Sequence, residues 1–460
     1  MKKSRLLSFF LSAALLTTLL LPWAAAEEAG GSSGFEPIRA KAALLVDADY
    51  NEVLYEENAH ETMYPASITK LMTALLVAEA IEAGQFTMDT VVTVPDNAFE
   101  GLSKDGSTQN IKAGERLTVK DLFYCLLVAS ANEAANILAL QVSGSLSAFV
   151  DQMNQKAADL GCEGTHFANP HGLHDPDHYT TAWDLYLLAR AAMEYPIIQE
   201  AVSAQEYYVP ATNLSEQRHF FNTNGLLSRL KYSYYYYPDA IGIKTGSTDA
   251  AGLCLVSAAR RDGRTLYAVV LGAEQVDLGD RVQLEQFSES IRLLEHGFSD
   301  FTRQTLIDPN EFVTSLRVTL SKTADQVILH PAEKLEAFLP KGADLNDLEP
   351  KITLYVDGDS VEAPVAQGQV LGSITLTYEG RDYGPVDLVA LDSVERSEWL
   401  YRQQQISQFL GQAWVKLVLV AVLILAAVLL LRATVFSRRR RYGGRTRSGG
   451  GSRGYRGRRR

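Results

Sequence analysis

The sequence predicts a mixed α/β protein in which helices cover a mainly antiparallel sheet, followed by a small β-rich domain and a C-terminal transmembrane helix. Three observations predict this class. Strand-type runs at 41–57 and 252–273 enclose a long region of helical periodicity. Between 301 and 394 that periodicity disappears, and short β-type runs alternate with Gly, Pro, Asp and Asn. Residues 413–436 are almost entirely apolar, and a membrane crossing needs about 20 such residues.

The N-terminus predicts secretion. Residues 1–26 combine a basic start, an apolar stretch and three alanines at 24–26, which is the pattern of a signal peptide cleaved after Ala26. The alternative is a retained membrane anchor. Two glutamates follow the alanines directly, which favours cleavage. We expect residues 27–37 to form a linker.

Residues 38–300 are predicted to form one domain. Its first strand-type run predicts two strands around a polar turn. Thr118 with Asp121, and Thr181 with Asp184, have the spacing of a capping box at two helix starts. Five helices are expected, at 67–82, 118–130, 132–143, 147–161 and 181–194.

The end of this domain predicts a second hairpin. The turn Asp262-Gly263 joins two apolar runs within 252–273. A last helix is expected at 284–298. The first and the late hairpin can pair in one sheet, because consecutive elements need not be neighbours.

The C-terminal part predicts a membrane attachment. We expect a β-rich domain at 301–394, a helical stalk at 395–412, a membrane-spanning helix at 413–436 and a basic tail at 437–460. Basic residues beside a span stay in the cytoplasm, so the tail is expected there, close to anionic lipid. The rest of the chain would lie outside the cytoplasm, held at the cell membrane. An arginine-rich tail that binds nucleic acid is the alternative, but the topology already accounts for its charge.

The predicted extracytoplasmic part is strongly acidic. Residues 27–415 contain 27 Lys and Arg against 55 Asp and Glu, a net charge of −28. This charge argues against nucleic acid as a main partner. Cys125 and Cys254 lie in apolar segments that predict buried thiols, Cys162 has no evident role, and no disulfide is expected.

Chemistry is indicated first by the segment YPASITKLMTALL at 64–76. Ser67 and Lys70 are three residues apart in a predicted helix, so their side chains lie one turn apart on the same side. Serine is a weak nucleophile until a base takes its proton. Lysine can be that base only if its pKa falls, and burial and a second nearby cation both lower it.

Two further fragments supply groups that this chemistry needs. IGIKTGSTDAAG places Lys244, Thr245 and Gly246 at the end of an apolar strand, with Lys244 as the second cation. Gly246 is expected to let a ligand approach the strand closely. LLVASANEAANI places Ser130 and Asn132 between two helices, where a hydroxyl can pass on a proton and an amide can bind a carbonyl. Each fragment alone is common, as a solvated lysine, a helix cap or a strand end. All three, in this order on helix, loop and strand, indicate one active site.

With these motifs the sequence resembles the D-alanyl-D-alanine carboxypeptidases, low-molecular-mass penicillin-binding proteins with the serine penicillin-recognising (β-lactamase/transpeptidase-like) fold. The resemblance covers residues 38–396 and includes the segments FANPHGLHDPDHYTTAWDLYLLAR, FNTNGLL and LLEHGF. The region 301–394 resembles the β-rich second domain of these enzymes.

The resemblance implies the catalytic roles. Ser67 attacks the carbonyl between the last two D-alanines of a peptidoglycan stem peptide, and Lys70 is the general base. Ser130, supported by Lys244, relays the proton to the departing D-alanine. Water then hydrolyses the acyl-enzyme. Penicillin and other β-lactams are expected to acylate Ser67 as inhibitors.

The resemblance also implies the substrate-binding residues. Asn132 binds the substrate's amide carbonyl. Lys244 and Thr245, followed by Gly246, hold the terminal carboxylate. The oxyanion lies between the backbone N–H groups of the nucleophile and of Ser247, and a helix N-terminus suits negative charge.

Two other segments have simpler explanations. Four histidines crowd the loop 166–178, but their spacing fits no zinc pattern, and we expect no metal and no cofactor. The segment YSYYYYPDA precedes the strand with Lys244. It would suit sugar stacking, but an irregular loop with packed aromatic rings is the simpler expectation.

Two alternatives to a carboxypeptidase stay open. A β-lactamase shares the three motifs, but one large class deacylates through a glutamate, and no convincing glutamate motif lies between Ser130 and Lys244. The β domain and the membrane attachment also favour a cell-wall enzyme. A non-catalytic penicillin sensor or wall-binding scaffold would retain all three motifs.

Overall fold

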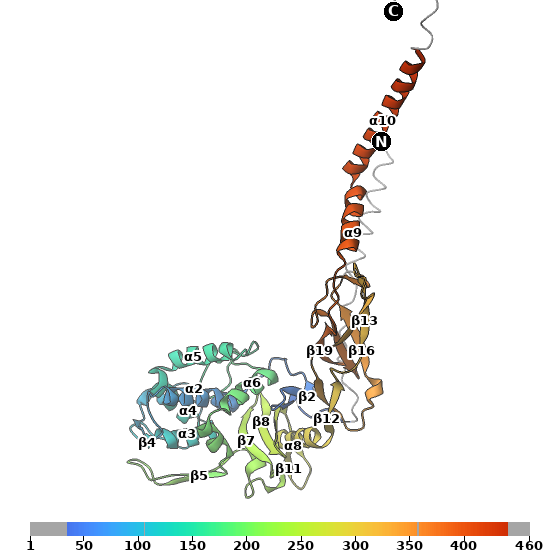
Figure 1. Ribbon diagram of the computed structural model, residues 1–460. Helices are drawn as coiled ribbons and strands as arrows, with labels where there is room; N and C mark the ends of the chain where they lie inside the picture. Colours follow the sequence, from blue (N-terminus) through green and yellow to red (C-terminus); the bar gives the residue numbers. More distant parts are fainter. Residues whose placement is uncertain (1–34, 105, 357, 440–460) are drawn as a thin grey trace, which may run out of the picture. The chain divides into compact units, whose positions relative to one another are not determined.

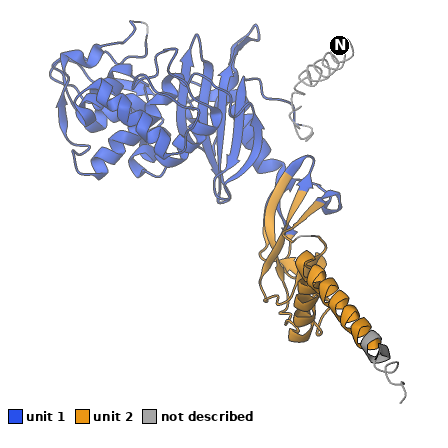
Figure 2. Ribbon diagram, turned by 90° about the horizontal axis from the view of Figure 1, so that it is seen from above, with its two compact units in different colours: residues 1–306, 336–349, 377–381 blue, residues 307–335, 350–376, 382–460 orange. Residues whose placement is uncertain are grey.

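The computed structural model describes residues 35–104, 106–356 and 358–439 (Figure 1). The predicted signal peptide, most of the predicted linker and nearly all of the predicted basic tail lie outside these residues. The chain divides into two compact units (Figure 2), of which the second comprises residues 307–335, 350–376 and 382 onward.

The first unit contains a five-stranded antiparallel sheet. Its strands lie in the order β2 (Glu52–Glu57), β1 (Ala42–Asp47), β9 (Arg264–Ala273), β8 (Gly252–Arg261) and β7 (Ala240–Thr248). The expected pairing of the first hairpin with the late one is confirmed, because β1 pairs with β9 along its length. Strand β7, which carries the Lys-Thr-Gly motif, is at the edge of the sheet.

Both faces of this sheet are apolar because helices cover both. Along β1, Ala42, Leu44 and Val46 belong to one buried cluster, whereas Ala43 and Leu45 belong to another. The first cluster also contains residues of α2 (Lys70–Glu82), α6 (Ala182–Ala192) and α7 (Pro196–Ser203), and the second contains residues of α8 (Glu285–Ser299). The predicted helix-covered antiparallel sheet is therefore confirmed.

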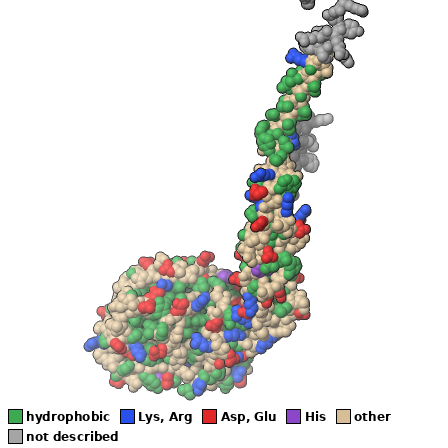
Figure 3. All heavy atoms as spheres, viewed as in Figure 1, with side chains coloured by type: hydrophobic (Ala, Val, Ile, Leu, Met, Phe, Trp, Pro, Cys, Tyr) green, Lys and Arg blue, Asp and Glu red, His purple; other side chains and the backbone are tan. Residues whose placement is uncertain are grey.

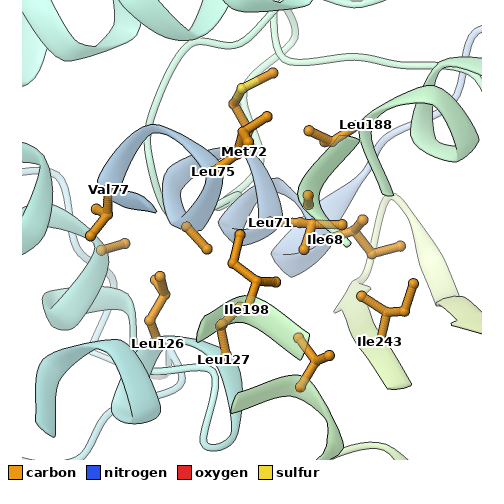
Figure 4. Packing of buried hydrophobic residues seen from close by; sticks show 14 of the residues in the cluster. Ile68, Leu71, Met72, Leu75, Val77, Leu126, Leu127, Leu188, Ile198 and Ile243 are labelled. Carbon is orange, nitrogen blue, oxygen red and sulfur yellow. The ribbon is translucent and has the colours of Figure 1, made fainter. Parts of the chain in front are cut away.

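Helix α2 lies inside the helical layer. It packs against α3 (Val119–Leu127), α4 (Asn132–Ser143) and α5 (Leu146–Asp159), as well as α6 and α7. Figure 4 shows its side chains Leu71, Met72 and Leu75 among Leu126, Leu188 and Ile198 of the surrounding helices. Every residue from Lys70 to Ala78 is buried. Lys70 is thus the first residue of a helix whose first nine residues are all buried.

The predicted helix starts are confirmed by their caps. The backbone N–H of Asp121 donates to Thr118 Oγ1 at 3.0 Å, and Thr118 N–H donates back to the Asp121 carboxylate at 3.3 Å. The backbone N–H of Asp184 likewise donates to Thr181 Oγ1 at 3.0 Å. These bonds satisfy N–H groups that a helix start would otherwise leave unpaired.

Some short elements were not predicted. The predicted helix at 67–82 begins with a separate 3-10 turn, η1 (Ala66–Thr69), before α2. Helix α7 was missed, as were three two-stranded pairs: β3 (Val91–Thr93) with β4 (Arg116–Thr118), β5 (Glu206–Val209) with β6 (Arg218–Phe221), and β10 (Gln275–Asp277) with β11 (Val282–Leu284). Runs of three or four residues are too short for a period of two to be recognised.

The β-type runs after residue 300 are confirmed as strands. Strand β12 (Phe301–Ile307) pairs with β15 (Leu335–Pro340). A six-stranded sheet has the order β16 (Glu349–Leu354), β18 (Val370–Tyr378), β19 (Arg381–Ala390), β14 (Gln326–Pro331), β13 (Thr314–Thr319) and β17 (Ser360–Glu362).

Two helices follow the second sheet. They are α9 (Glu398–Gly411) and α10 (Ala413–Arg439), with exposed apolar side chains along α10 that appear green in Figure 3. The apolar part of α10 runs over the 22 residues from Ala413 to Thr434, and an 18-residue window within it has a mean hydropathy of 2.9. This length and composition fit a membrane crossing.

Candidate active site

Ser67 lies on η1, at the entrance to α2. Ala66 has a φ of 48°, in the left-handed region that costs a residue with a Cβ about 1–3 kcal/mol. Ile68 and Thr69 are buried, whereas Ser67 is half-buried. The turn is therefore fixed by its neighbours while the hydroxyl of Ser67 remains accessible.

The amine of Lys70 joins three oxygens. Lys70 is 0% exposed, and its Nζ lies 2.8 Å from Ser67 Oγ, 2.8 Å from Asn132 Oδ1 and 2.6 Å from the backbone oxygen of His171. The expected contact between Ser67 and Lys70 is present, and Asn132 joins it. The His171 carbonyl was not predicted, because no sequence pattern marks a backbone oxygen.

These contacts orient a neutral amine for proton abstraction. Asn132 Oδ1 and the His171 carbonyl oxygen can only accept hydrogen bonds, so they take the two hydrogens of a neutral amine. The lone pair then points at Ser67 Oγ, whose hydroxyl can donate to it. An ammonium would instead donate to Ser67 and could not accept its proton.

Burial favours this neutral form. Burial, and next the positive charge of Lys244, hold the pKa of Lys70 well below its usual value. Burial also lowers the pKa of Lys244, to about 7. The second cation inferred from the sequence therefore acts on Lys70 in the expected direction.

Lys244 acts at a distance. Its Nζ donates to the neighbouring backbone oxygen of Thr245 at 3.1 Å. Within the described ranges, neither Lys244 nor Ser130 is hydrogen-bonded to Ser67 or Lys70. The influence of Lys244 on Lys70 is thus electrostatic.

The structure gives a second reason for a glycine at position 246, besides the expected approach of a ligand. Strand β7 continues to Thr248, so Gly246 lies inside the strand and not at its end. A Cβ at Gly246 would lie 2.7 Å from the backbone oxygen of Pro65 and 3.2 Å from Ala66 Cβ. The absent side chain therefore makes room for the turn that carries the nucleophile.

Ser130 lies between α3 and α4, as predicted, and Asn132 is the first residue of α4. Ser130 is 5% exposed and has a φ of 61°, a strained conformation for a residue with a side chain. The backbone N–H of Asn132 donates to the backbone oxygen of Ser107 at 2.9 Å. A Cβ on Gly106 would lie 2.6 Å from Asn132 Nδ2. The segment around Gly106 was not predicted to take part, and it lies against the Asn132 amide.

The loop 168–178 holds the nucleophile's turn from the other side. A Cβ at Gly172 would lie 1.9 Å from the backbone oxygen of Ala66. Thr73 Oγ1 donates to the backbone oxygen of Pro170 at 2.7 Å. The loop is therefore part of the site, a role that the sequence did not predict for it.

The histidines of this loop are structural. His178 Nδ1 accepts from the backbone N–H of Ala168 at 3.0 Å, so Nε2 carries the hydrogen that is directed at Thr69 Oγ1, 2.7 Å away. Burial lowers the pKa of His178 to about 4 and that of His171 to about 3, so both are neutral. His174 packs edge-on against Tyr64. Among the described residues, no three His, Cys, Asp or Glu side chains are grouped as a metal site.

The cysteines and the tyrosine-rich loop add no chemistry here. All three cysteines are buried free thiols, and burial raises the pKa of Cys254 to about 11 and of Cys162 to about 12. Tyr232 and Tyr235 pack against Phe287 as expected, whereas Tyr234 is 80% exposed.

Thr245 has a partner that sequence reasoning missed. Its Oγ1 lies 2.7 Å from Thr223 Oγ1. Thr223 belongs to the FNTNGLL segment, which carries no familiar catalytic pattern. Ser247, the remaining predicted residue, lies on β7 with its side chain exposed. Because β7 is an edge strand, alternate backbone N–H groups point away from β8.

A serine whose proton can pass to a buried neutral lysine, on this helix-covered sheet, defines the serine penicillin-recognising enzymes. Comparison with known proteins gives the family. The model of the D-alanyl-D-alanine carboxypeptidase family, peptidase S11, matches residues 28–275, and that of the penicillin-binding protein 5 C-terminal domain matches residues 301–396. The chain belongs to this carboxypeptidase family and is a serine-type peptidase.

Individual relatives agree along most of the chain. The D-alanyl-D-alanine carboxypeptidase DacF of Bacillus subtilis is 31% identical over 379 residues, which cover 82% of this chain and 92% of the relative. The structure of DacD from Francisella tularensis matches with a TM-score of 0.63 at 27% identity, covering 79% of this chain and 95% of that one. Penicillin-binding protein 5 of Haemophilus influenzae matches with a TM-score of 0.56 at 27% identity, over 78% of this chain and 99% of its own.

Proposed function

We propose that this protein removes the terminal D-alanine from peptidoglycan stem pentapeptides through an acyl-enzyme on Ser67. The observation that carries the proposal is the placement of the buried Lys70 Nζ, 2.8 Å from Ser67 Oγ and held by two acceptor oxygens. Membership of the carboxypeptidase family supports the substrate class.

The first half-reaction forms an ester. Lys70 takes the Ser67 hydroxyl proton as Oγ attacks the carbonyl carbon of the penultimate D-alanine. The tetrahedral oxyanion is stabilised by backbone N–H groups of Ser67 and Ser247. The C–N bond then breaks, and the proton on Lys70 reaches the leaving amine through the Ser130 hydroxyl. Water hydrolyses the ester and releases the shortened peptide.

Substrate binding follows from the same residues. Asn132 Oδ1 is engaged by Lys70, which leaves the Nδ2 hydrogens of Asn132 for the substrate's amide carbonyl. Lys244 and Thr245 bind the terminal carboxylate. Gly246 contributes by bringing β7 close to the nucleophile's turn.

We also propose the domain order and topology inferred from the sequence. After removal of the signal peptide at 1–26, the chain outside the cytoplasm consists of the 27–37 linker, the catalytic domain at 38–300, the β-rich domain at 301–394 and the stalk at 395–412. The helix at 413–436 crosses the membrane, and the tail at 437–460 contacts anionic lipid on the cytoplasmic side. The apolar helix α10 supports this arrangement.

The test is product analysis with the full-length protein in detergent. We expect a pentapeptide ending in D-Ala-D-Ala to lose one alanine by mass. Ser67→Ala should abolish the loss, whereas Ser147→Ala, which removes an exposed hydroxyl on α5, should not.

Labelled penicillin separates the alternatives. A long-lived adduct on Ser67 together with D-alanine release supports the carboxypeptidase. Rapid release of hydrolysed penicillin without D-alanine release would support a β-lactamase. A stable adduct without any D-alanine release would support a penicillin sensor.

A further inference from the structure

Thr223 connects two walls of the active site. Its hydroxyl oxygen lies 2.7 Å from Thr245 Oγ1, beside Lys244 on β7. Its backbone N–H donates at 3.1 Å to Val128, two residues before Ser130. We propose that Thr223 is a positioning residue that fixes the Thr245 hydroxyl for binding the substrate's terminal carboxylate. This role rests on the function proposed above.

The segment around Thr223 is rigid enough for this task. The flanking residues Asn222 and Asn224 are 1% and 0% exposed. Asn222 Nδ2 donates to the backbone oxygen of Ala204 at 2.8 Å, and Asn224 Oδ1 accepts from the backbone N–H of Leu226 at 3.0 Å. Two buried amides thus anchor the backbone on both sides of Thr223, which is itself only half-buried.

The direction of the hydrogen bond follows from the chemistry. A hydroxyl has one hydrogen to donate. If Thr245 gives its hydrogen to a carboxylate, it can only accept from Thr223, so Thr223 is the donor. In the bound state the Thr223 hydroxyl therefore donates to Thr245 Oγ1, and the Thr245 hydrogen is directed at the carboxylate. The 2.7 Å contact already fixes the position of Thr245 Oγ1 before a ligand binds, which lowers the cost of ordering Thr245 on binding.

The kinetic signature is a change in binding rather than in chemistry. Thr223→Val has nearly the same shape but lacks the hydroxyl. We expect it to raise KM for D-Ala-D-Ala release about tenfold with kcat within about twofold, because an interaction made equally in ground and transition states changes KM alone. Thr223→Ser restores the hydroxyl and should return KM to within about threefold of the wild type.

Controls isolate the path through Thr245. In a Thr245→Val background, adding Thr223→Val should change KM by less than about twofold, since the partner is already absent. Thr265→Val is the matched control: its hydroxyl is likewise part of a side-chain hydrogen bond, accepting from Arg260 Nε at 3.2 Å, and Thr265 lies at the start of β9 and outside the site. It should leave KM unchanged. Thermal unfolding of each full-length variant verifies that it is folded.

Three outcomes would overturn the proposal: an equal effect of Thr223→Val with and without Thr245, failure of Thr223→Ser to restore KM, or a loss in kcat alone. The rate of acylation by labelled penicillin, which also presents a carboxylate, gives a second readout. If the wild type forms the adduct but releases no D-alanine, the proposed function fails. The acylation rates of the same variants still test Thr223.

Discussion

Lys70 combines two demands that conflict. A buried lysine in its charged form destabilises the fold, because the ammonium group loses its hydration. The same burial makes the neutral amine available as a base. Its three oxygen partners then decide which direction the lone pair takes. Stability has been given up here for reactivity, as is usual at active sites.

Replacement of Lys70 should separate these demands. We expect Lys70→Met to reduce acylation by labelled penicillin at least about 1,000-fold, since the serine loses its base. Its free energy of unfolding should rise by about 1–3 kcal/mol, because methionine has a similar length and, unlike Lys70, does not have to lose a proton and its hydration on burial. Lys156→Met, which removes a partly exposed ion pair with Glu79, should change neither property strongly. Normal acylation by Lys70→Met would refute Lys70 as the base.

The pH dependence of acylation should show both lysines. Below its lowered pKa, Lys70 becomes charged and cannot accept the Ser67 proton, so the rate falls on the acidic side. Above about pH 7, Lys244 loses its proton and with it the charge that binds a carboxylate, so kcat/KM also falls on the alkaline side.

The substitution Lys244→Arg tests the alkaline fall in kcat/KM. The guanidinium stays charged throughout this range, so Lys244→Arg should remove the alkaline fall in kcat/KM even if the absolute rate drops. The measurement is the pH profile of penicillin acylation from pH 5 to 10. An alkaline limb that persists in Lys244→Arg would assign it to another group.

Which residues were predictable depends on how local their signals are. Ser67, Lys70 and Asn132 lie in short motifs whose residue types carry the chemistry. The His171 carbonyl and the Thr223 hydroxyl have no such signal. They contribute to the site only because segments far apart in the sequence pack together. No local sequence pattern shows which distant segments come into contact.

The element that determines the site's geometry is the turn η1. It is strained at Ala66, and the strain persists because β7 packs on one side and the loop 168–178 on the other. Both contacts occur at glycines, Gly246 and Gly172, where a residue with a Cβ would clash with the turn. The turn is thus located by the backbone of its neighbours.

Alanine at Gly172 should therefore damage the site more than the same change elsewhere. Gly172 and Gly84 both have positive φ, of 83° and 74°, but nothing lies within 4 Å of a Cβ at Gly84. Gly84→Ala should cost about 1–2 kcal/mol of stability from φ alone, with normal acylation. Gly172→Ala should cost at least about 1–3 kcal/mol more through the clash with Ala66 and should slow acylation. Thermal unfolding and penicillin labelling measure both, and equal effects would contradict this account.

Helices and strands could be predicted from the sequence where they are long. The capped helices and the strands of ten residues were recognised by their periodicity and turn residues. The 3-10 turn at Ala66 and the short pair β5–β6 were not, because tertiary contacts rather than local propensity hold such elements.

For the whole molecule, composition was sufficient to indicate two folded regions and an apolar C-terminal helix. The fold class followed from the order of strand-type and helical runs, and the resemblance to carboxypeptidases then gave the fold family with its β-rich second domain. Periodicity alone could not have given the strand order, which depends on pairing between β1 and β9, two strands far apart in the sequence.

Removal of α10 should release the protein from the membrane. A chain that stops after Gln412 lacks the apolar helix α10 and should appear in the soluble fraction with D-alanine release retained. A chain that lacks only residues 440–460 keeps the span and should remain in the membrane fraction. Membrane association of the shorter chain would show that another segment provides the anchor.

The two glycine contacts of η1 have a consequence for drug resistance. Substitutions that moved the nucleophile away from β-lactams would have to displace backbone atoms on both sides at once, and they would equally remove it from the cell-wall peptide. We therefore do not expect resistance substitutions that act by displacing Ser67. We expect tolerated resistance changes to lie among side chains that meet the drug but not D-alanine.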